Sequence, residues 1–275
     1  MRIAAGDWVA TLEPMGGAIA SLTRRGVDIL RPTPAGARDP LAFASFALVP
    51  YANRIAGGAF TFAGGSHMLP RNYPGQAHPL HGMGWLSPWD VAASDEASAT
   101  LVHRHAPDAA WPWAYTATQQ IALDATGLTV SLALQNTGDG AMPYSLGFHP
   151  YFVRAGVQAL AFAAEGVWQA DAAMLPTTLA APDTFGDWSR GAPLARPDLI
   201  DHCYAGWNGS ATIERDDGAV TLSGIGTGLL HFFLPSGEAY FCAEPVTAMP
   251  DAVNRDAADV LAPGARREIA MIIRG

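Results

Sequence analysis

Apolar residues recur at every second position in short segments of this chain, and this pattern limits the fold more than any other feature. In Leu128–Leu134, for example, every second residue is Leu or Val. Because successive side chains of a β-strand point to opposite faces, such a segment presents one apolar face. Similar segments are Ala99–His105, Tyr115–Leu123, Ala211–Arg215, Ala219–Ser223, Leu229–Leu234, Ala239–Ala243 and Arg267–Ile273. No segment keeps a helical apolar period beyond about two turns.

Glycine and proline divide the chain into these short segments. Its 29 glycines and 21 prolines are spread along the whole sequence. Asp124–Gly127 separates two alternating segments and has the composition of a turn, which predicts a hairpin. Arg31–Pro40 is expected to form a surface loop, and Leu175–Pro197 a long loop or an excursion between sheets. Many short strands separated by turns predict an all-β fold, a large antiparallel β-sandwich.

The length fits one domain. Sandwiches often reach ~200–250 residues as a single unit, and the chain has 275 residues without an internal repeat or a linker-like stretch. With 49% hydrophobic and 15% charged residues, its composition is that of a folded chain. We therefore expect a single domain over residues 1–275.

The charged residues exclude several classes of function. All 16 cationic residues are arginine, and 25 acidic residues give a net charge of −9. Nucleic-acid binding depends on cations that displace counterions from phosphates, and anionic membranes also select basic surfaces, so neither partner is expected. A chain without lysine cannot form a Schiff base or a P-loop phosphate site.

The N-terminal segment and the cysteines favour a cytoplasmic protein. The first residues do not resemble a signal peptide, and no apolar run approaches the ~20 residues that cross a bilayer. Cys203 and Cys242 lie in apolar segments. They are expected as small buried hydrophobic residues rather than as a disulfide or a metal site.

Ionisable residues interrupt the apolar pattern at a few places. Asn53-Arg54 stands between an apolar segment and a glycine pair, where an arginine either forks onto ligand oxygens or satisfies loop carbonyls. His149 lies in an aromatic stretch before a proline; burial would lower the pKa of its imidazole, and a nearby carboxylate would raise it. Glu244 ends a run of uncharged residues, so it lies at an exposed strand end or is held for a function. Asp201 begins another apolar strand.

His103 and His105 are two residues apart on a predicted strand, a spacing that metal ligands also use. No further histidine or glutamate follows at a suitable near spacing, and the strand runs into a turn, so metal binding is not the favoured role. The sequence also lacks the G-x-S-x-G elbow, which argues against a serine hydrolase.

Five short stretches carry a family resemblance. PYANRI, HPLHG, PYSLGFHPYF, DHCYAGW and EPVTAMPDAVN occur in this order between residues 50 and 254, and together they resemble the aldose 1-epimerase (galactose mutarotase) family. The resemblance implies a β-supersandwich with a sugar cleft on one sheet. It also implies interconversion of the α and β anomers of a free hexose without a metal or an organic cofactor. The family usually shows Leu-His-Gly-Gly where Met83 follows Gly82 here, a departure that bears on substrate preference.

Carried over position by position, the resemblance assigns catalytic roles. Glu244 is similar to the family's general base and His149 to its general acid, with His81 as a second histidine at the sugar ring. Mutarotation needs a base for the proton of the anomeric hydroxyl and an acid for the ring oxygen, which are expected on either side of the sugar.

The same resemblance implies which residues bind the sugar. Arg54 and Asp201 are expected to bind hydroxyls, with Asn53 supporting the arginine. Aromatic candidates for the floor of the cleft are Tyr51, Tyr151 and Trp85.

Other functions stay open at this stage. A mutarotase for a phosphorylated or otherwise charged hexose would need a further cation, for which Arg71 is the one candidate nearby in sequence. A non-catalytic carbohydrate-binding domain would not need both Glu244 and His149. A glycosidase that used Asp201 and Glu244 would leave the histidines without a role. In each case the partner is a small-molecule sugar, and we expect a monomer or a homodimer.

Overall fold

The computed structural model describes all 275 residues. Its regular elements are antiparallel β-strands and five short 3₁₀ helices. The helices are η1 (Pro40–Ala42), η2 (Ala56–Gly58), η3 (Gly84–Leu86), η4 (Trp188–Arg190) and η5 (Ala252–Asn254). None of them has the length and apolar character of a membrane-crossing segment. The predicted all-β antiparallel fold is confirmed.

Two large sheets contain most of the strands. Ten strands of the twelve-stranded sheet follow the order β1 (Arg2–Ala5), β2 (Trp8–Glu13), β3 (Ala18–Arg24), β4 (Val27–Leu30), β14 (Tyr151–Val153), β22 (Tyr240–Val246), β21 (Leu229–Leu234), β18 (Ile200–Ala205), β16 (Gly166–Ala170) and β17 (Pro176–Ala180). Its other two strands are β13 (Gly147–Phe148), which pairs with β22, and β5 (Ala47–Leu48), which pairs with β13.

The second large sheet has eight strands. Their order is β15 (Val157–Phe162), β19 (Ser210–Arg215), β20 (Val220–Ile225), β24 (Arg266–Arg274), β11 (Gly127–Asn136), β10 (Tyr115–Asp124), β9 (Ser98–His105) and β8 (Asp90–Ser94). Two small sheets pair β12 (Met142–Tyr144) with β23 (Asp259–Leu261) and β6 (Ala59–Phe62) with β7 (Gly65–Met68).

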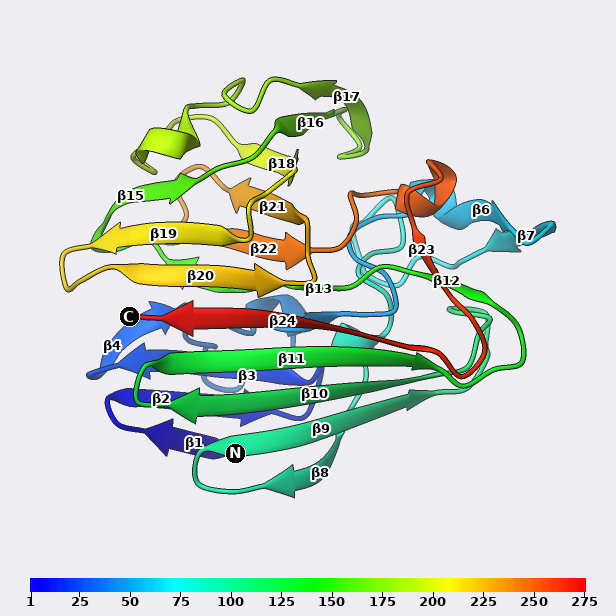
Figure 1. Cartoon of the computed structure of the whole chain (residues 1–275), viewed down its shortest axis with the longest axis horizontal. Coiled ribbons are helices and arrows are strands. Elements are labelled where there is room, and N and C mark those ends of the chain that lie inside the picture. Colours follow the sequence, from blue (N-terminus) through cyan, green and yellow to red (C-terminus); the bar gives the residue numbers. More distant parts are fainter.

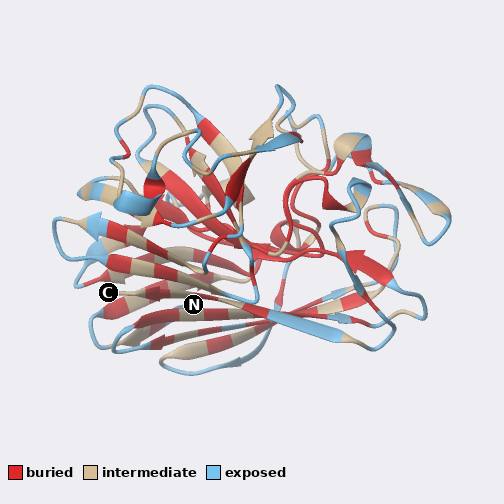
Figure 2. Ribbon diagram, turned by 45° about the horizontal axis from the view of Figure 1, so that its top comes forward, coloured by how far each residue is buried: buried red, intermediate tan, exposed pale blue.

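The large sheets form two layers, with the eight-stranded sheet in front of the other in Figure 1. The main hydrophobic core has 53 buried residues and draws on both sheets, for example Leu132 of β11 and Phe232 of β21. Buried and more exposed residues alternate along many strands in Figure 2. The alternation seen in the sequence therefore turns one face of each sheet toward a shared core.

The other face of the twelve-stranded sheet is covered by a smaller core of 12 buried residues. It joins side chains of the sheet, such as Tyr151 and Cys242, to Phe46 and Trp85 of the segment that precedes β8. Cys203 belongs to the same core, and both cysteines are buried, as predicted. No disulfide joins them. This second face carries the candidate site.

Most predicted strands are confirmed with small shifts at their ends. The hairpin of β10 and β11 closes through Asp124 and Gly127, as predicted. The predicted strand Ala239–Ala243 continues to Val246, so Glu244 lies inside β22. The prediction of Leu175–Pro197 as a long loop or an excursion between sheets is partly wrong, because the segment contains β17, which joins the twelve-stranded sheet, and η4. β17 is an edge strand with three exposed central residues, so it shows no apolar alternation.

Candidate active site

The candidate site is a row of polar side chains across the middle of the twelve-stranded sheet. In the β21–β22 ladder His231 stands opposite Glu244, and in the β18–β21 ladder Cys203 stands opposite His231. Asp201 lies two residues before Cys203 on β18, so its side chain leaves the same face. Period-two alternation therefore brings Glu244, His231 and Asp201 together from three strands.

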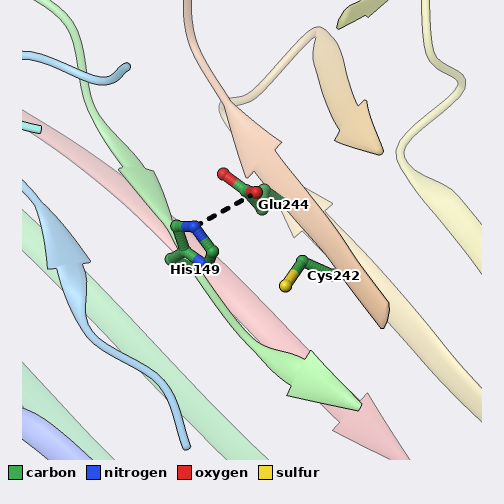
Figure 3. A group of neighbouring side chains, drawn as sticks. All are labelled: His149, Cys242 and Glu244. Atoms are coloured by element: carbon green, nitrogen blue, oxygen red, sulfur yellow. Dashed lines mark ion pairs between the residues drawn. The ribbon is translucent and has the colours of Figure 1, made fainter. Parts of the chain in front are cut away.

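His149 extends this row at a break between two strands. β13 and β14 pair with β22 on either side of His149, and the register of the two pairings places His149 opposite Glu244. A proline follows, and the N–H of His149 donates to the carbonyl of Phe46 (3.0 Å) rather than to β22. Nε2 of His149 faces Oε1 of Glu244 at 3.4 Å (Figure 3). The predicted acid and base thus lie side by side on one wall, not on either side of a ligand.

Burial sets the protonation of this pair, since only 9% of the His149 side chain and 1% of the Glu244 side chain are exposed. Burial raises the pKa of Glu244 to about 8, against the opposing effect of the His231 charge. Burial also lowers the pKa of His149 to about 3, and the His231 charge adds to that effect. Near neutral pH the pair therefore holds one proton, on Glu244.

Asp201 and His231 form a buried ion pair next to Glu244. Nε2 of His231 donates to Oδ1 of Asp201 at 2.6 Å. Burial alone would lower the pKa of His231, but its hydrogen bond to Asp201 and the charges of Glu244 and Asp201 raise it well above its usual value. Burial opposes ionisation of Asp201 too, yet the bond to His231 lowers its pKa. The sequence pattern does not identify His231 as a site residue, because a single histidine in an apolar strand has the same pattern as a histidine that only packs in the core.

His81 and Asn53 hold each other in two loops at the edge of the row. The N–H of His81 donates to the Asn53 carbonyl at 2.8 Å, and the N–H of Asn53 donates to Nδ1 of His81 at 3.1 Å. Their φ angles are 58° and 61°, values that few non-glycine residues adopt. Burial, with the charges of His149 and Arg54, lowers the pKa of His81 well below its usual value. Because Nδ1 is an acceptor, neutral His81 carries its proton on Nε2 and presents a donor.

Arg54 is oriented by the side chain of Asn53. Oδ1 of Asn53 accepts hydrogen bonds from the backbone N–H (2.9 Å) and from Nη1 (3.1 Å) of Arg54. The same loop is fixed by Asp251, whose N–H donates to the Arg54 carbonyl at 2.7 Å and whose Oδ1 accepts from the N–H of Ala56 at 2.9 Å. Asp251 of the PDAVN stretch therefore positions Arg54 of the PYANRI stretch, so both stretches contribute to the same site.

These side chains line one cavity of about 140 Å³. Its wall contains seven of the nine predicted site residues: Asn53, Arg54, His81, His149, Tyr151, Asp201 and Glu244. The wall is completed by His231, Gln76, Leu41, Leu80 and Phe233. The ring of Tyr151 stacks on His149 with centroids 4.6 Å apart. A few apolar surfaces among many polar groups suit a ligand rich in hydroxyls.

Trp85 and Tyr51 do not occupy the predicted floor of the cleft. Trp85 is fully buried, and its indole N–H lies 3.1 and 3.0 Å from two loop carbonyls. Its ring packs edge-on against His81 with centroids 5.7 Å apart, so it supports the histidine from behind. Tyr51 lines a separate pocket and packs against Trp111. Of the three aromatic candidates, Tyr151 lines the cavity.

Other polar candidates lie outside the cavity. His103 packs against the rings of Trp89 and Tyr115, with centroids 5.5 and 5.6 Å apart. Nε2 of His105 makes a 2.8 Å hydrogen bond with a backbone carbonyl. Arg71 lines a neighbouring, open recess.

Proteins of similar sequence match almost the whole chain. The family model described as aldose 1-epimerase matches residues 2–274. The uncharacterised protein YphB of Escherichia coli (strain K12) is 31% identical over 276 residues, covering 94% of this chain and 92% of YphB. The uncharacterised protein YihR of the same organism is 30% identical over 265 residues, covering 92% of this chain and 85% of YihR.

Solved structures show the same fold. A provisionally assigned aldose 1-epimerase from Escherichia coli K12 superposes with a TM-score of 0.91 and 29% identity, covering 99% of this chain and 97% of that chain. A galactose mutarotase-like protein from Clostridium acetobutylicum superposes with a TM-score of 0.86 and 22% identity, covering 99% of this chain and 93% of that chain.

Proposed function

The chain belongs to the aldose 1-epimerase family, and from this premise we propose that it interconverts the α and β anomers of a free aldose such as galactose or glucose. The observation that carries the proposal is the buried His149–Glu244 pair, which faces the cavity with its nitrogen and oxygen 3.4 Å apart. Opening the sugar ring requires two proton transfers, closing it requires their reverse, and this pair offers one group for each.

In the proposed reaction the pair exchanges protons with two oxygens of the sugar. Glu244 takes the proton of the O1 hydroxyl, the C1–O5 bond breaks as a C1=O1 double bond forms, and His149 delivers a proton to O5. Rotation about the C1–C2 bond presents the other face of the aldehyde, and the reverse steps close the other anomer. O1 and O5 are bonded to the same carbon, so a base and an acid that are neighbours suit this reaction.

The reaction begins and ends with one proton on the His149–Glu244 pair. Burial favours the neutral arrangement, with this proton on Glu244. The first step starts from the other arrangement, a carboxylate and an imidazolium, and the positive charges of His231 and Arg54 favour the Glu244 carboxylate. Both arrangements hold the same number of protons, so the pair serves either direction of the reaction.

Arg54, Asp201 and His81 are the proposed contacts for the sugar hydroxyls. The Arg54 guanidinium presents donors in a fixed fork. Asp201 uses Oδ1 for His231, which leaves Oδ2 to accept from a hydroxyl. Neutral His81 presents its Nε2–H as a donor. These groups bind the ring, while the pair acts at C1.

The cavity favours a neutral sugar over a charged one. Arg54 is its one arginine, whereas Arg71 lines the neighbouring recess. The other cation on the wall, His231, is already paired with Asp201, so Arg54 alone would be left to recognise a phosphate by charge-assisted bonds. A glycosidase is disfavoured as well, because Asp201 is bonded to His231 and is not a free second carboxyl group.

Optical rotation tests the proposal. Freshly dissolved α-D-galactose and α-D-glucose are followed with wild-type protein, Glu244→Gln and His149→Asn. We expect wild type to accelerate the change, and each variant to lose about 10²–10⁴-fold in rate while Glu244→Gln still binds sugar in calorimetry. A near-normal rate for Glu244→Gln would remove Glu244 from the mechanism. Acceleration with glucose 6-phosphate alone would favour a charged substrate.

A further inference from the structure

Cys242 stands beside the proposed acid–base pair without a part in the reaction. It lies two residues before Glu244 on β22, so the two side chains leave the same face of the strand. His149 faces them from the break between β13 and β14 (Figure 3). One nitrogen of His149, the sulfur of Cys242 and one carboxylate oxygen of Glu244 all lie within 4.8 Å of one another.

These three atoms are ligand types that zinc binds. Zn²⁺ takes Cys sulfur at about 2.3 Å, His nitrogen at about 2.0–2.1 Å and carboxylate oxygen at about 2.0–2.2 Å, in tetrahedral geometry. Ligand atoms at such bond lengths lie about 3.3–3.6 Å apart. The 3.4 Å between Nε2 of His149 and Oε1 of Glu244 already meets this spacing. The sulfur of Cys242 lies within 4.8 Å of a ligand atom of each partner, so a movement of its side chain toward them would complete the set.

Burial and charge also suit a divalent cation at this cluster. All three side chains are buried, and Oε2 of Glu244 has no hydrogen-bond partner. A thiolate, a carboxylate and a neutral imidazole together neutralise a dication, which avoids a buried net charge. His149 and Glu244 line the cavity, so a fourth coordination position would open toward it.

We propose that Zn²⁺ binds reversibly to His149, Cys242 and Glu244 and inhibits the enzyme. Binding releases the protons of the thiol and the carboxyl group to solvent and occupies the lone pairs that would otherwise move protons. The binding is independent of the reaction, whereas the inhibition rests on the proposed function. Arg54 lines the same cavity and repels a dication, so we expect weaker binding than at a structural zinc site.

A zinc titration of the whole chain tests the binding. Metal-free protein competes with a chromophoric zinc indicator, and Cys242→Ala is compared with Cys203→Ala. Both thiols are buried and unpaired on the same sheet, but only Cys242 belongs to the cluster. We expect one Zn²⁺ per chain for wild type and Cys203→Ala. Cys242→Ala should lose more than the ~10–100-fold in affinity that is typical when an outer-shell partner is removed.

Cobalt supplies a second measurement that needs only wild-type protein. Co²⁺ bound through Cys242 should show a thiolate-to-metal charge-transfer band. This spectrum decides the question even where a variant fails to fold. Equal zinc affinity in wild type and a folded Cys242→Ala, or a wild-type cobalt complex without the thiolate band, would overturn the site.

Mutarotation at increasing Zn²⁺ separates this inference from the proposed function. For each protein the mutarotation rate with metal is divided by the rate without metal. We expect this ratio to fall in the same way for wild type and Cys203→Ala as Zn²⁺ increases, and a chelator to restore both rates. Zinc that binds without slowing a measurable reaction would overturn the inhibition. A metal-free protein that accelerates no sugar would contradict the proposed function, and the titration would still decide the zinc site.

Discussion

Nε2 of His231 lies 2.6 Å from Oδ1 of Asp201, and this buried ion pair stands directly beside Glu244 in the sheet. The positive charge of His231 opposes the burial that raises the pKa of Glu244 to about 8. His231 thus connects Asp201, which is proposed to bind the sugar, with Glu244, which is proposed to act at C1. His231 is therefore a positioning residue whose effect should extend to both.

Replacing His231 by Asn is expected to lower kcat/KM and to move its pH dependence upward. Loss of a hydrogen bond to a charged group costs about 1.5–3 kcal/mol, or roughly 10–150-fold in rate. Without the His231 cation the pKa of Glu244 rises further, so the alkaline fall in kcat/KM moves to higher pH. Polarimetric rates on both sides of pH 8 measure both effects.

His202→Asn is the matched control for that variant. His202 neighbours Asp201 on β18, but its ring stacks on Phe185 with centroids 3.8 Å apart and does not line the cavity. We expect it to keep the wild-type pH profile. A His231→Asn enzyme that is slower but has an unmoved profile would show that His231 contributes only packing.

Activity of the metal-free enzyme is expected to fall as the pH rises through about 8. The reaction needs the one proton shared by His149 and Glu244. The pair holds one proton between the pKa of His149, about 3, below which a second proton binds, and the pKa of Glu244, about 8, above which the single proton is lost. The value of kcat/KM should therefore be flat near neutral pH and then fall by about tenfold per pH unit. Rates are measured after subtraction of spontaneous mutarotation, and a rate that climbs through this range would assign activity to the deprotonated pair.

The sequence locates most of this site because alternation has a local signature. Asp201 and Glu244 stand out as charges in apolar strands, and His149 as a histidine among aromatic residues. That His231 faces Glu244 depends on the register of β21 against β22, which no local pattern contains. Pairing between strands is set by the whole sheet, so this neighbour could not be predicted.

The remaining differences have equally physical causes. An aromatic residue beside a histidine has the same sequence pattern whether it contacts a ligand or supports the histidine from behind. Trp85 packs against Phe46, with centroids 5.3 Å apart, so it supports the histidine and does not contact a ligand. β17 escaped prediction because an edge strand with exposed residues on both faces needs no apolar alternation.

Glu244→Gln is expected to make the fold more stable while it removes activity. The pKa of Glu244 is about 8 in the folded chain, well above the usual ~4.3 of an unfolded one. The stability that the neutral carboxyl group contributes is thus complete below pH ~4.3 and lost as the pH rises toward 8. Glutamine stays neutral, so the difference in free energy of unfolding should grow over that range, up to about 5 kcal/mol.

Denaturant unfolding at several pH values measures this difference. Asp201→Asn provides a comparison of opposite sign, because His231 lowers the pKa of Asp201 and the variant breaks the ion pair. It should destabilise the fold at neutral pH. A gain in Glu244→Gln that stays constant with pH would contradict the raised pKa of Glu244.

Asn53→Gly is expected to raise KM for the sugar while it keeps the fold. Glycine adopts the φ of 61° without strain, but Oδ1 of Asn53, which accepts two hydrogen bonds from Arg54, is lost. At about 0.5–1.5 kcal/mol for each of the two bonds, binding should weaken by roughly fivefold to 150-fold, and kcat should change less. Asn53→Ala removes the same oxygen and adds strain at positive φ, so it should also unfold at lower temperature. If KM rises in both variants, the effect belongs to the lost oxygen. If KM rises only in Asn53→Ala, the effect belongs to backbone strain. An unchanged KM in both variants would show that Asn53 does not orient Arg54 toward the sugar.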